Sequence, residues 1–525
     1  MENESFKENL NNNYNNEPVA KAVTEPVTET IIETRDAIDD GFLQKAKDFI
    51  DNKNDYLKRI ILCAIYAIFY TFCLYKNSNG ITFPLFAIAT IVVYCLFLKA
   101  IGEKIKTFSY VLMGMITLLA LNVCTTASTP LLVFDKIFMC GLFFVLFLYN
   151  LYDEKTWDAT RYFLAVNSVI FSSIAYVLDP ILDLVRISKE RGEKEEKIRK
   201  KNTTILYVLL GLAISVPLLC VILPLLLSSD IVFFEAFRKI FSFRIDKNVI
   251  SMALLTLFIF IAGYALIKRL CIRQGWLEIP VKDKRNSNPV VSITISAVLL
   301  VFYALYSGIQ IIYLFLGFGT LPKGYTYADY AHEGFFQLVF VCLINLVLVL
   351  ICRKFSKDNK VLKIMLTFIC SCTYIMLFSS AYRMILYIGA YGLTFLRVYV
   401  LWALLVILLA ITGAVILIFQ EKMPFVKYSM VVIAATWIVF SMSHPDTYIA
   451  EYNLSMQTGE RYVVEALSDD AVPVIMAHRD RLDSVEKLED TMNIFDRRYS
   501  NYELSKDFRR FNFAKYNAAK ALANK

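Results

Sequence analysis

The chain has 525 residues, of which 57% are hydrophobic and only 19% are charged, and its mean hydropathy is +0.52. Soluble domains are about 45–50% apolar, so this composition excludes an ordinary soluble protein and indicates a membrane protein with several spans. The net charge of +8 would suggest a nucleic-acid partner in a soluble chain. Here most basic residues lie in short loops between long apolar runs, where they report orientation, and we expect no nucleic-acid partner.

Residues 1–56 are polar and include the asparagine-rich run NNNYNNE at 11–17. They show no pattern that would form a packed core, so we predict a disordered N-terminal tail. The first apolar run starts near Leu57, too late for a cleaved signal peptide. We expect this run to act as an uncleaved signal anchor.

Long apolar runs after this tail predict eleven membrane-spanning helices, because a helix needs about 20 apolar residues to cross a bilayer. Four fall in an N-terminal membrane region, 57–151, and seven in a membrane core, 204–443. The predicted fold class is therefore all-α, a polytopic transmembrane helix bundle. The expected spans are 57–75, 81–101, 108–127, 131–151, 204–227, 248–270, 289–318, 334–352, 364–386, 393–419 and 424–443.

Residues 152–203, between the two membrane regions, are predicted to form an amphipathic helix and a basic cytoplasmic loop. In the segment 162–185, apolar residues recur at helical spacing, and Pro180 interrupts the pattern. We expect this segment to lie on the membrane surface rather than to cross it. The apolar stripe consists of Phe163, Val166, Ile170, Ile174, Val177, Ile181 and Val185.

The distribution of basic residues favours the same arrangement. If 162–185 does not cross, the basic run RISKERGEKEEKIRKK at 186–201 lies on the side of the N-terminus, with most other loop lysines and arginines. The positive-inside rule then predicts a cell-membrane protein with a cytoplasmic N-terminus and an extracytoplasmic C-terminal tail. We interpret the run itself as a solvated helix that sets the topology, with binding to anionic headgroups as the alternative.

Ionisable residues gather at the predicted extracytoplasmic end of the core. Arg383 and Arg397 lie on either side of a turn expected near Gly389–Gly392, and charges within a membrane usually face the bundle interior. We predict a polar cluster that either clasps the helices together or binds an anionic headgroup or solute. Snorkelling of the two arginines to lipid phosphates is a further interpretation. The candidate ligand-binding residues are Arg383, Arg397, Asp329, Glu333, Tyr327, Asp230 and Asp446.

The remaining polar residues offer little chemistry. No H-E-x-x-H, G-x-S-x-G or Walker A motif occurs, the eleven cysteines lie mostly inside apolar runs, and the three histidines are far apart. We therefore expect no catalytic residue, no metal site and no cofactor. Gln310 and Asn345 are expected to form hydrogen bonds between helices. Asp135 and Lys136 are adjacent residues and are not expected to face each other.

Residues 444–525 are hydrophilic and are predicted to form a small, helical, soluble tail. Ser468 or Asp469 is the expected N-cap of a helix with Pro473 within its first turn or so. The last segment, 502–525, is predicted to be a basic, aromatic helix. It would dock as a solvated helix or, alternatively, bind a membrane surface or an anionic wall polymer.

Four stretches of the chain resemble, in the same order, blocks of a known family. They read LLGLAISVPLLCVILPLLLSSDIVFFEAF, YTYADYAHEGFFQLVFVCLINL, YRMILYIGAYGLTFLRVYVLW, and HPDTYIAEYNL followed by LSDDAVPVI, and they lie between residues 200 and 475. The family is an uncharacterised bacterial family of polytopic membrane proteins, catalogued only as a domain of unknown function. The resemblance implies a bacterial envelope protein with a multi-span core. It implies no established activity, so no catalytic residue is carried over.

We therefore predict a multi-span envelope membrane protein that binds or transports an anionic lipid or solute at its extracytoplasmic face. Its expected partners are the lipid bilayer and an anionic headgroup or envelope polymer. The alternative is a membrane sensor or assembly protein whose tail and outer loops bind a partner. A third hypothesis, a membrane-embedded transferase, needs an acid or base such as Asp329 or Glu333 in a cleft at lipid level. The sequence leaves the oligomeric state open.

Overall fold

The computed structural model describes most of the chain from residue 53 onward. Within the described residues the chain is helical, and no strand occurs apart from an isolated bridge between Ser287 and Ser356. This confirms the predicted all-α class. The predicted tail (except 53–56) and the basic run 186–201 lie outside the described residues. These residues are 53–152, 157–183, scattered positions between 211 and 235, 247–272, 285, 287–312, 327–458, 460–479 and 489–523.

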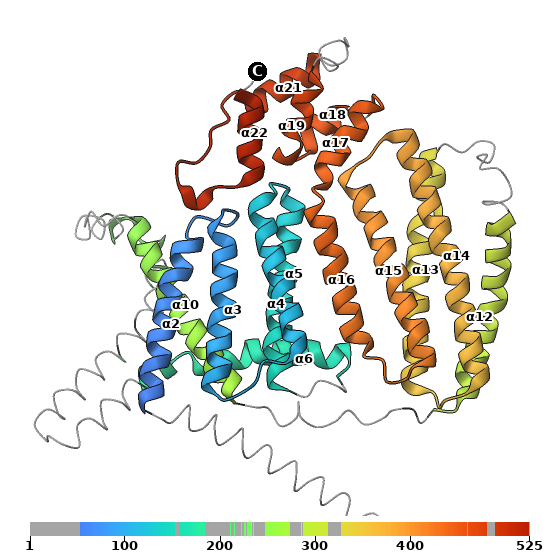
Figure 1. Ribbon diagram of the computed structural model, residues 1–525, viewed down its shortest axis with the longest axis horizontal. Coiled ribbons are helices and arrows are strands. Elements are labelled where there is room, and N and C mark those ends of the chain that lie inside the picture. Colours follow the sequence, from blue (N-terminus) through green and yellow to red (C-terminus); the bar gives the residue numbers. More distant parts are fainter. Residues whose placement is uncertain are drawn as a thin grey trace, which may run out of the picture.

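Nine of the described helices are long and apolar enough to cross a membrane, and they coincide with nine of the eleven predicted spans. The predicted span 57–75 forms α2 (Lys53–Leu74), and the span predicted at 204–227 lies mostly outside the described residues. The long helices stand side by side in Figure 1. The nine are α3 (Thr82–Ala100), α4 (Thr107–Thr125), α5 (Thr129–Leu151), α10 (Lys247–Cys271), α12 (Pro289–Gln310), α13 (Tyr327–Phe355), α14 (Lys360–Tyr391), α15 (Phe395–Phe419) and α16 (Phe425–Met442).

Two apolar cores hold these helices together. The first joins α3, α4, α5 and α16 around fully buried side chains such as Leu112, Leu146 and Trp437. The second joins α13, α14 and α15 around Leu366 and Ile411, with α12 packed against it. Helices α15 and α16 pack against each other and connect the two cores. Many large apolar side chains stay exposed on these helices, as expected where a protein surface contacts lipid.

Polar side chains inside the second core form the interhelical hydrogen bonds predicted from the sequence. The Ser379 hydroxyl of α14 donates to Gln310 Oε1 of α12 at 2.7 Å. The Tyr303 hydroxyl of α12 donates to Asn345 Oδ1 at 2.7 Å, and Asn345 Nδ2 donates to Thr373 Oγ1 at 2.9 Å. Asn345 of α13 therefore links α12 to α14 within the apolar core.

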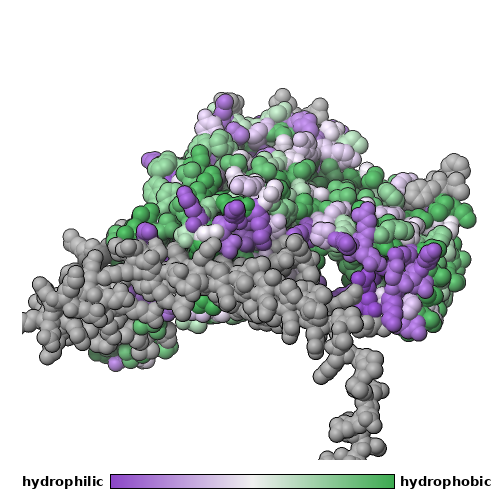
Figure 2. All heavy atoms as spheres, turned by 60° about the horizontal axis from the view of Figure 1, so that its bottom comes forward, coloured by the Kyte–Doolittle hydropathy of each residue, from purple (hydrophilic) through white to green (hydrophobic). Residues whose placement is uncertain are grey.

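The two ends of the bundle are held by different contacts. We call the end with Arg285, Arg353 and Glu421 the basal end, and the end with the turns 75–81 and 392–394 the distal end; they lie at the bottom and top of Figure 1. Glu421 pairs with Arg285 and Arg353 at 2.8 and 3.2 Å, and hydrogen bonds from these arginines hold the pKa of Glu421 below its usual range. Figure 2 shows hydrophilic residues gathered at the basal end beneath α12–α15.

Helix α6 (Ala159–Ser173) runs across the basal end rather than along the bundle, and a 3₁₀ turn, η1 (Ile174–Tyr176), follows it (Figure 1). With 15 residues, α6 is too short to cross a bilayer. Ala165 is buried against the protein, whereas Phe163 of the predicted apolar stripe is 67% exposed. Ile170 and Ile174 of the stripe are also exposed, whereas Val166 packs against the first apolar core. Part of the stripe therefore points away from the bundle, as expected for a helix in the plane of the membrane surface.

The described residues after His444 form a helical domain over the distal end (Figure 1), with a core of its own around Ile449, Val464 and Phe495. Ser468 acts as the N-cap predicted from the sequence, since its side chain accepts a hydrogen bond from Asp470 N. We call this part the C-terminal domain. Its elements are α17 (Pro445–Ser455), α18 (Glu460–Ala466), η4 (Asp469–Ala471), α19 (Val472–Ala477), α21 (Glu489–Tyr499), η6 (Phe508–Arg510) and α22 (Phe513–Ala523).

The prediction of one helix over 502–525 is wrong, because α22 begins only at Phe513. Residues 507–512, which we call the strap, run over the distal end and contain only the short turn η6. The Asp507 side chain accepts a hydrogen bond from Arg509 N at 3.1 Å. Such a side chain to backbone bond competes with the regular helical pattern, so the helix starts after the strap.

The strap docks on the turn between α2 and α3. Ile81 N donates to Phe511 O at 2.8 Å, and Asn77 Nδ2 donates to Arg509 O at 2.8 Å. Gly80 lies so close beneath the strap that a Cβ atom on it would sit 2.0 Å from Arg509 O. Only glycine permits this approach of two backbones, so Gly80 is required for the docking.

We expect Gly80→Ala to displace the strap and to destabilise the protein by about 1–3 kcal/mol, the usual cost of overpacking. The thermal unfolding temperature of the purified chain should fall, and proteases should cleave near the strap more quickly. Gly114→Ala on α4 is the control, because a Cβ atom there would meet nothing within 4 Å. Equal stability of the two variants would contradict the close contact at Gly80.

Candidate functional site

A cavity of about 490 Å³ lies between the distal end of the bundle and the C-terminal domain. The turn 126–130 and Phe395, at the start of α15, form its membrane side. The C-terminal domain contributes polar side chains, among them Asp446, Arg498 and Lys515. Small-molecule sites commonly have volumes of about 300–1,000 Å³, so this space is large enough for a ligand. We call it the distal cavity.

Asn512 builds one wall of the distal cavity by joining the strap to three separate carbonyl groups. Its Nδ2 donates to the backbone oxygens of Asn79, Val123 and Thr126 at 3.1, 3.3 and 2.9 Å. Its Oδ1 accepts from Lys515 N at 3.2 Å and caps the first turn of α22. One buried amide therefore holds α22 and its lysine beside the ends of α3 and α4.

Asp470 binds the turn 126–130, which lines the distal cavity. Its carboxylate accepts from Ala127 N at 2.8 Å and from the Thr126 hydroxyl. His444 Nδ1 lies 3.5 Å from the same carboxylate. The turn between α4 and α5 is thus bound by side chains of the C-terminal domain on two sides.

Asp446 lies in the first turn of α17 and is 3% exposed at the edge of the distal cavity. It accepts hydrogen bonds from Ser468 N at 3.2 Å and from the Ser468 hydroxyl at 2.5 Å. Burial raises the pKa of Asp446, and the nearby charge of Asp470 adds to this, while hydrogen bonds from Ser468 and Ser128 act in the opposite direction. The carboxyl of Asp446 therefore binds a proton more readily in the folded protein than in the unfolded chain.

Two cations and a second carboxylate complete the lining. Arg498 donates to the backbone oxygens of Val464 and Leu467 at 2.9 and 2.8 Å, and its side chain also lines the distal cavity. Lys515 is exposed on α22. Asp469 accepts from the Tyr502 hydroxyl at 3.0 Å. The distal cavity thus offers both cationic groups and carboxylates to a ligand.

Arg397 caps the end of α14. The helix ends at Gly392, whose φ of +75° favours glycine, and Arg397 Nη1 donates to Tyr391 O at 2.9 Å and to Gly392 O. Its guanidinium lies 4.2 Å from the centre of the Tyr387 ring. A cation at a helix C-terminus is favourable, so these contacts support the clasp interpretation for Arg397.

Arg397 and Asp446 lie near one common neighbour, Tyr462 of α18. The Tyr462 hydroxyl accepts from Phe395 N at 3.0 Å and lines the distal cavity. Burial raises the pKa of Tyr462; the charge of Asp446 raises it further, whereas Arg397 lowers it. Asp446 and Tyr462 line the distal cavity, whereas Arg397 caps α14 and is not among the residues that line it.

Arg383 is buried in α14, with 8% exposure, two turns below the distal end. Arg383 lies 23 positions after Lys360, the first residue of α14. Glu333 lies 22 positions before Phe355, the last residue of α13. Because α13 and α14 pack as an antiparallel hairpin with equal rise per residue, their backbones put Arg383 and Glu333 at one level.

Of the three other candidate residues of the sequence analysis, only Asp230 has a described side chain, and it is not among the residues that line the distal cavity. Tyr327 and Asp329 begin α13, but their side chains, like that of Glu333, lie outside the described residues. Asp230 is exposed and accepts a hydrogen bond from Val232 N at 2.7 Å, which caps the following turn.

Asp135 of α5 is buried and was not among the candidate site residues of the sequence analysis. It accepts hydrogen bonds from Asn122 Nδ2 at 2.8 Å, Trp437 Nε1 at 2.8 Å and the Ser441 hydroxyl at 3.1 Å. These donors come from α4 and α16, so the carboxylate joins three helices close to the distal end. Residues 122, 135 and 441 show no common pattern in the sequence, and only the fold brings them together.

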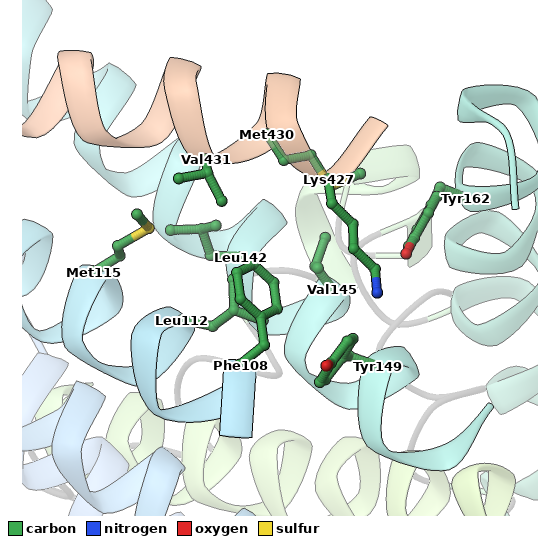
Figure 3. Close-up of a pocket in the computed structure, with 10 residues that line it drawn as sticks. All are labelled: Phe108, Leu112, Met115, Leu142, Val145, Tyr149, Tyr162, Lys427, Met430 and Val431. Atoms are coloured by element: carbon green, nitrogen blue, oxygen red, sulfur yellow. The ribbon is translucent and has the colours of Figure 1, made fainter. Parts of the chain in front are cut away.

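A second pocket, near the basal end, is too small for a ligand. Figure 3 shows Lys427 of α16 extending toward Tyr149 and Tyr162 from a surrounding of apolar side chains. Lys427 Nζ lies 4.9 Å from the centre of the Tyr149 ring. The space measures about 10 Å³, which is at most room for one water molecule. We interpret this contact as packing between α5 and α16.

Comparison with known proteins agrees with the resemblance noted from the sequence and extends it. A family described as "Domain of unknown function (DUF4153)" matches residues 113–478, more than two thirds of the chain. The match begins within α4 and ends directly after α19, so it includes Asp446 but not Arg498 or Lys515. Neither a curated protein nor a solved structure matches the chain.

We expect Asp446→Asn to change how stability depends on pH. The pKa of Asp446 is higher in the folded protein than the ordinary aspartate pKa. The stability that this group contributes is therefore present below the ordinary pKa and is lost as pH rises through the raised pKa. The unfolding temperature of the wild type minus that of Asp446→Asn should therefore increase as pH is lowered from 7 toward 4. Subtracting the two unfolding temperatures removes the contributions of the other titrating groups. A difference in unfolding temperature that does not change with pH would contradict the raised pKa of Asp446.

Proposed function

The chain belongs to the DUF4153 family, a domain of unknown function, and on this premise we propose that it is a membrane protein that binds a small anionic ligand in the distal cavity. The ligand carries a phosphate or a similar anion and is either a lipid headgroup or a solute. The observation that carries the proposal is the size and polar lining of the distal cavity, which joins the bundle to the C-terminal domain.

The charges around the distal cavity support this ligand class. Lys515 and Arg498 bring positive charges to the lining, and each can donate to an anionic oxygen. Asp446 and Asp469 can accept hydrogen bonds from hydroxyl or amino groups on the same ligand. A phosphate that carries a glycerol or amino alcohol, as in common lipid headgroups, has both kinds of group.

The proposal includes an orientation in the cell membrane. The basal end carries many basic residues, such as Lys357, Lys360 and Lys422, all of which are exposed. By the positive-inside rule we assign the basal end to the cytoplasm and the C-terminal domain to the extracytoplasmic side. The distal cavity then opens at the outer surface of the membrane.

A sensor is the second candidate function, because the distal cavity has walls from two separately packed parts. The C-terminal domain has its own apolar core, and its contacts with the bundle lie in the turns around the cavity. A ligand that touches both walls would favour the docked arrangement over any other. Loss of the ligand would then change the surface that the C-terminal domain presents to a partner.

Cysteine labelling tests the orientation. We expect a membrane-impermeant maleimide to label Arg461→Cys on α18 in intact cells, because the Arg461 side chain is 75% exposed in the C-terminal domain. Lys422→Cys, in the basal turn between α15 and α16, should react only after the cells are permeabilised. The opposite pattern would exclude the proposed orientation.

Ligand titration tests the distal cavity. If the protein recognises the phosphate alone, we expect both glycerol 1-phosphate and a short-chain phosphatidylglycerol to raise the unfolding temperature of the purified full chain. If acyl chains contribute to binding, we expect only the lipid to raise it. Lys515→Gln should raise the apparent Kd about tenfold, since a hydrogen bond to a charged group contributes roughly 1.5 kcal/mol or more.

The matched control is Lys520→Gln, which removes the same charge from an exposed position of α22 that does not line the distal cavity. It should bind both probes like the wild type. If neither probe stabilises the wild type, or if both lysine variants lose binding equally, the proposed site is wrong.

A further inference from the structure

We propose that a groove between α2, α3 and α10 binds one anionic phospholipid of the basal leaflet. The lipid phosphate lies at Lys58 and Arg59, and one acyl chain follows an apolar slot toward the membrane centre. This groove is at the opposite end of the bundle from the distal cavity, and the inference does not depend on the proposed function.

The groove consists of two adjoining cavities. Helices α3 and α10 both pack against α2, and the cavities lie between them. The lower cavity, of about 200 Å³, is lined by Lys58 and Arg59 together with apolar side chains. The upper cavity, of about 90 Å³, is apolar apart from its far end and includes Gly263. Phe97 and Ile267 line both cavities, so the two cavities adjoin at these side chains.

The groove has the depth that an acyl chain needs. From Arg59 to Tyr66 the helix α2 rises about 10 Å toward the membrane centre. The Tyr66 hydroxyl and Thr90 Oγ1 are 2.8 Å apart, and this hydrogen bond between α2 and α3 lies at the upper end of the slot. A Cβ atom on Gly263 would meet nothing within 4 Å, so the wall beside it opens into empty space.

The charges at the mouth of the groove favour an anion. Arg59 is 2% exposed and lies 3.8 Å from Asp183, while Lys268 lies 2.6 Å from Asp179. Lys58 is exposed, and both Lys58 and Arg59 line the lower cavity. A basic mouth above an apolar slot between membrane helices is complementary to a phospholipid, which has a phosphate next to its acyl chains.

Photo-crosslinking tests the groove. The full-length chain is reconstituted in vesicles of phosphatidylglycerol and phosphatidylcholine that contain a trace of phosphatidylglycerol with a diazirine in one acyl chain. We expect crosslinks on peptides of α2, α3 and α10 that line the slot. Gly263→Phe, which fills the slot, should reduce these crosslinks to the level seen on other lipid-facing helices. Lys58→Gln should reduce them about fivefold, the effect of removing one basic residue near a membrane surface.

Two control variants show whether these losses are specific. Gly141→Phe adds the same ring to α5 at a position where a Cβ atom also meets nothing within 4 Å. Lys104→Gln removes an exposed basal charge outside the groove. Both should crosslink like the wild type. If Gly263→Phe does not fold, Gly263→Leu and Lys58→Gln test the two halves of the site. Crosslinks that survive these changes, or that a phosphatidylcholine probe gives equally, would overturn the proposal.

Discussion

Backbone groups at the ends of membrane helices need hydrogen-bond partners, and at the distal end the C-terminal domain provides them. Asn512 serves three carbonyl groups, and Asp470 accepts from the turn between α4 and α5. Asn453 of α17 forms both an acceptor and a donor bond with the backbone of Leu393 at 2.7 and 2.8 Å. The bundle and the C-terminal domain therefore complete each other, and the distal cavity exists because of these contacts.

The same constraint explains the buried charges. Arg397 caps α14, Asp135 accepts from three donors, and Asp183 lies among Arg59, Tyr264 and other polar groups at the basal end. A buried charge is costly unless hydrogen bonds or an opposite charge compensate it, so each of these groups first has a structural role. Binding chemistry requires a charge that lines a cavity, as Lys515 does at the distal cavity and Lys58 does at the groove between α2, α3 and α10.

The sequence predicted the described architecture well because apolar length and charge bias are local signals. The nine spans, the surface helix α6, the Ser468 cap and the bonds of Gln310 and Asn345 follow from such patterns. The distal cavity does not, because its walls join residues such as Asn79 and Asn512 that are far apart in sequence. The strap was also mispredicted, since its backbone bonds go to another part of the chain.

The position of the strap sets an order on assembly. Arg509 O accepts from Asn77, a residue 432 positions earlier, so the loop between α2 and α3 receives this partner only after the strap has been synthesised. Until then, α2 and α3 lie in the bilayer while the loop between them lacks the hydrogen bonds that the strap provides. Quality control that recognises such a loop would detect any chain truncated before the strap, even if all its membrane helices had been inserted.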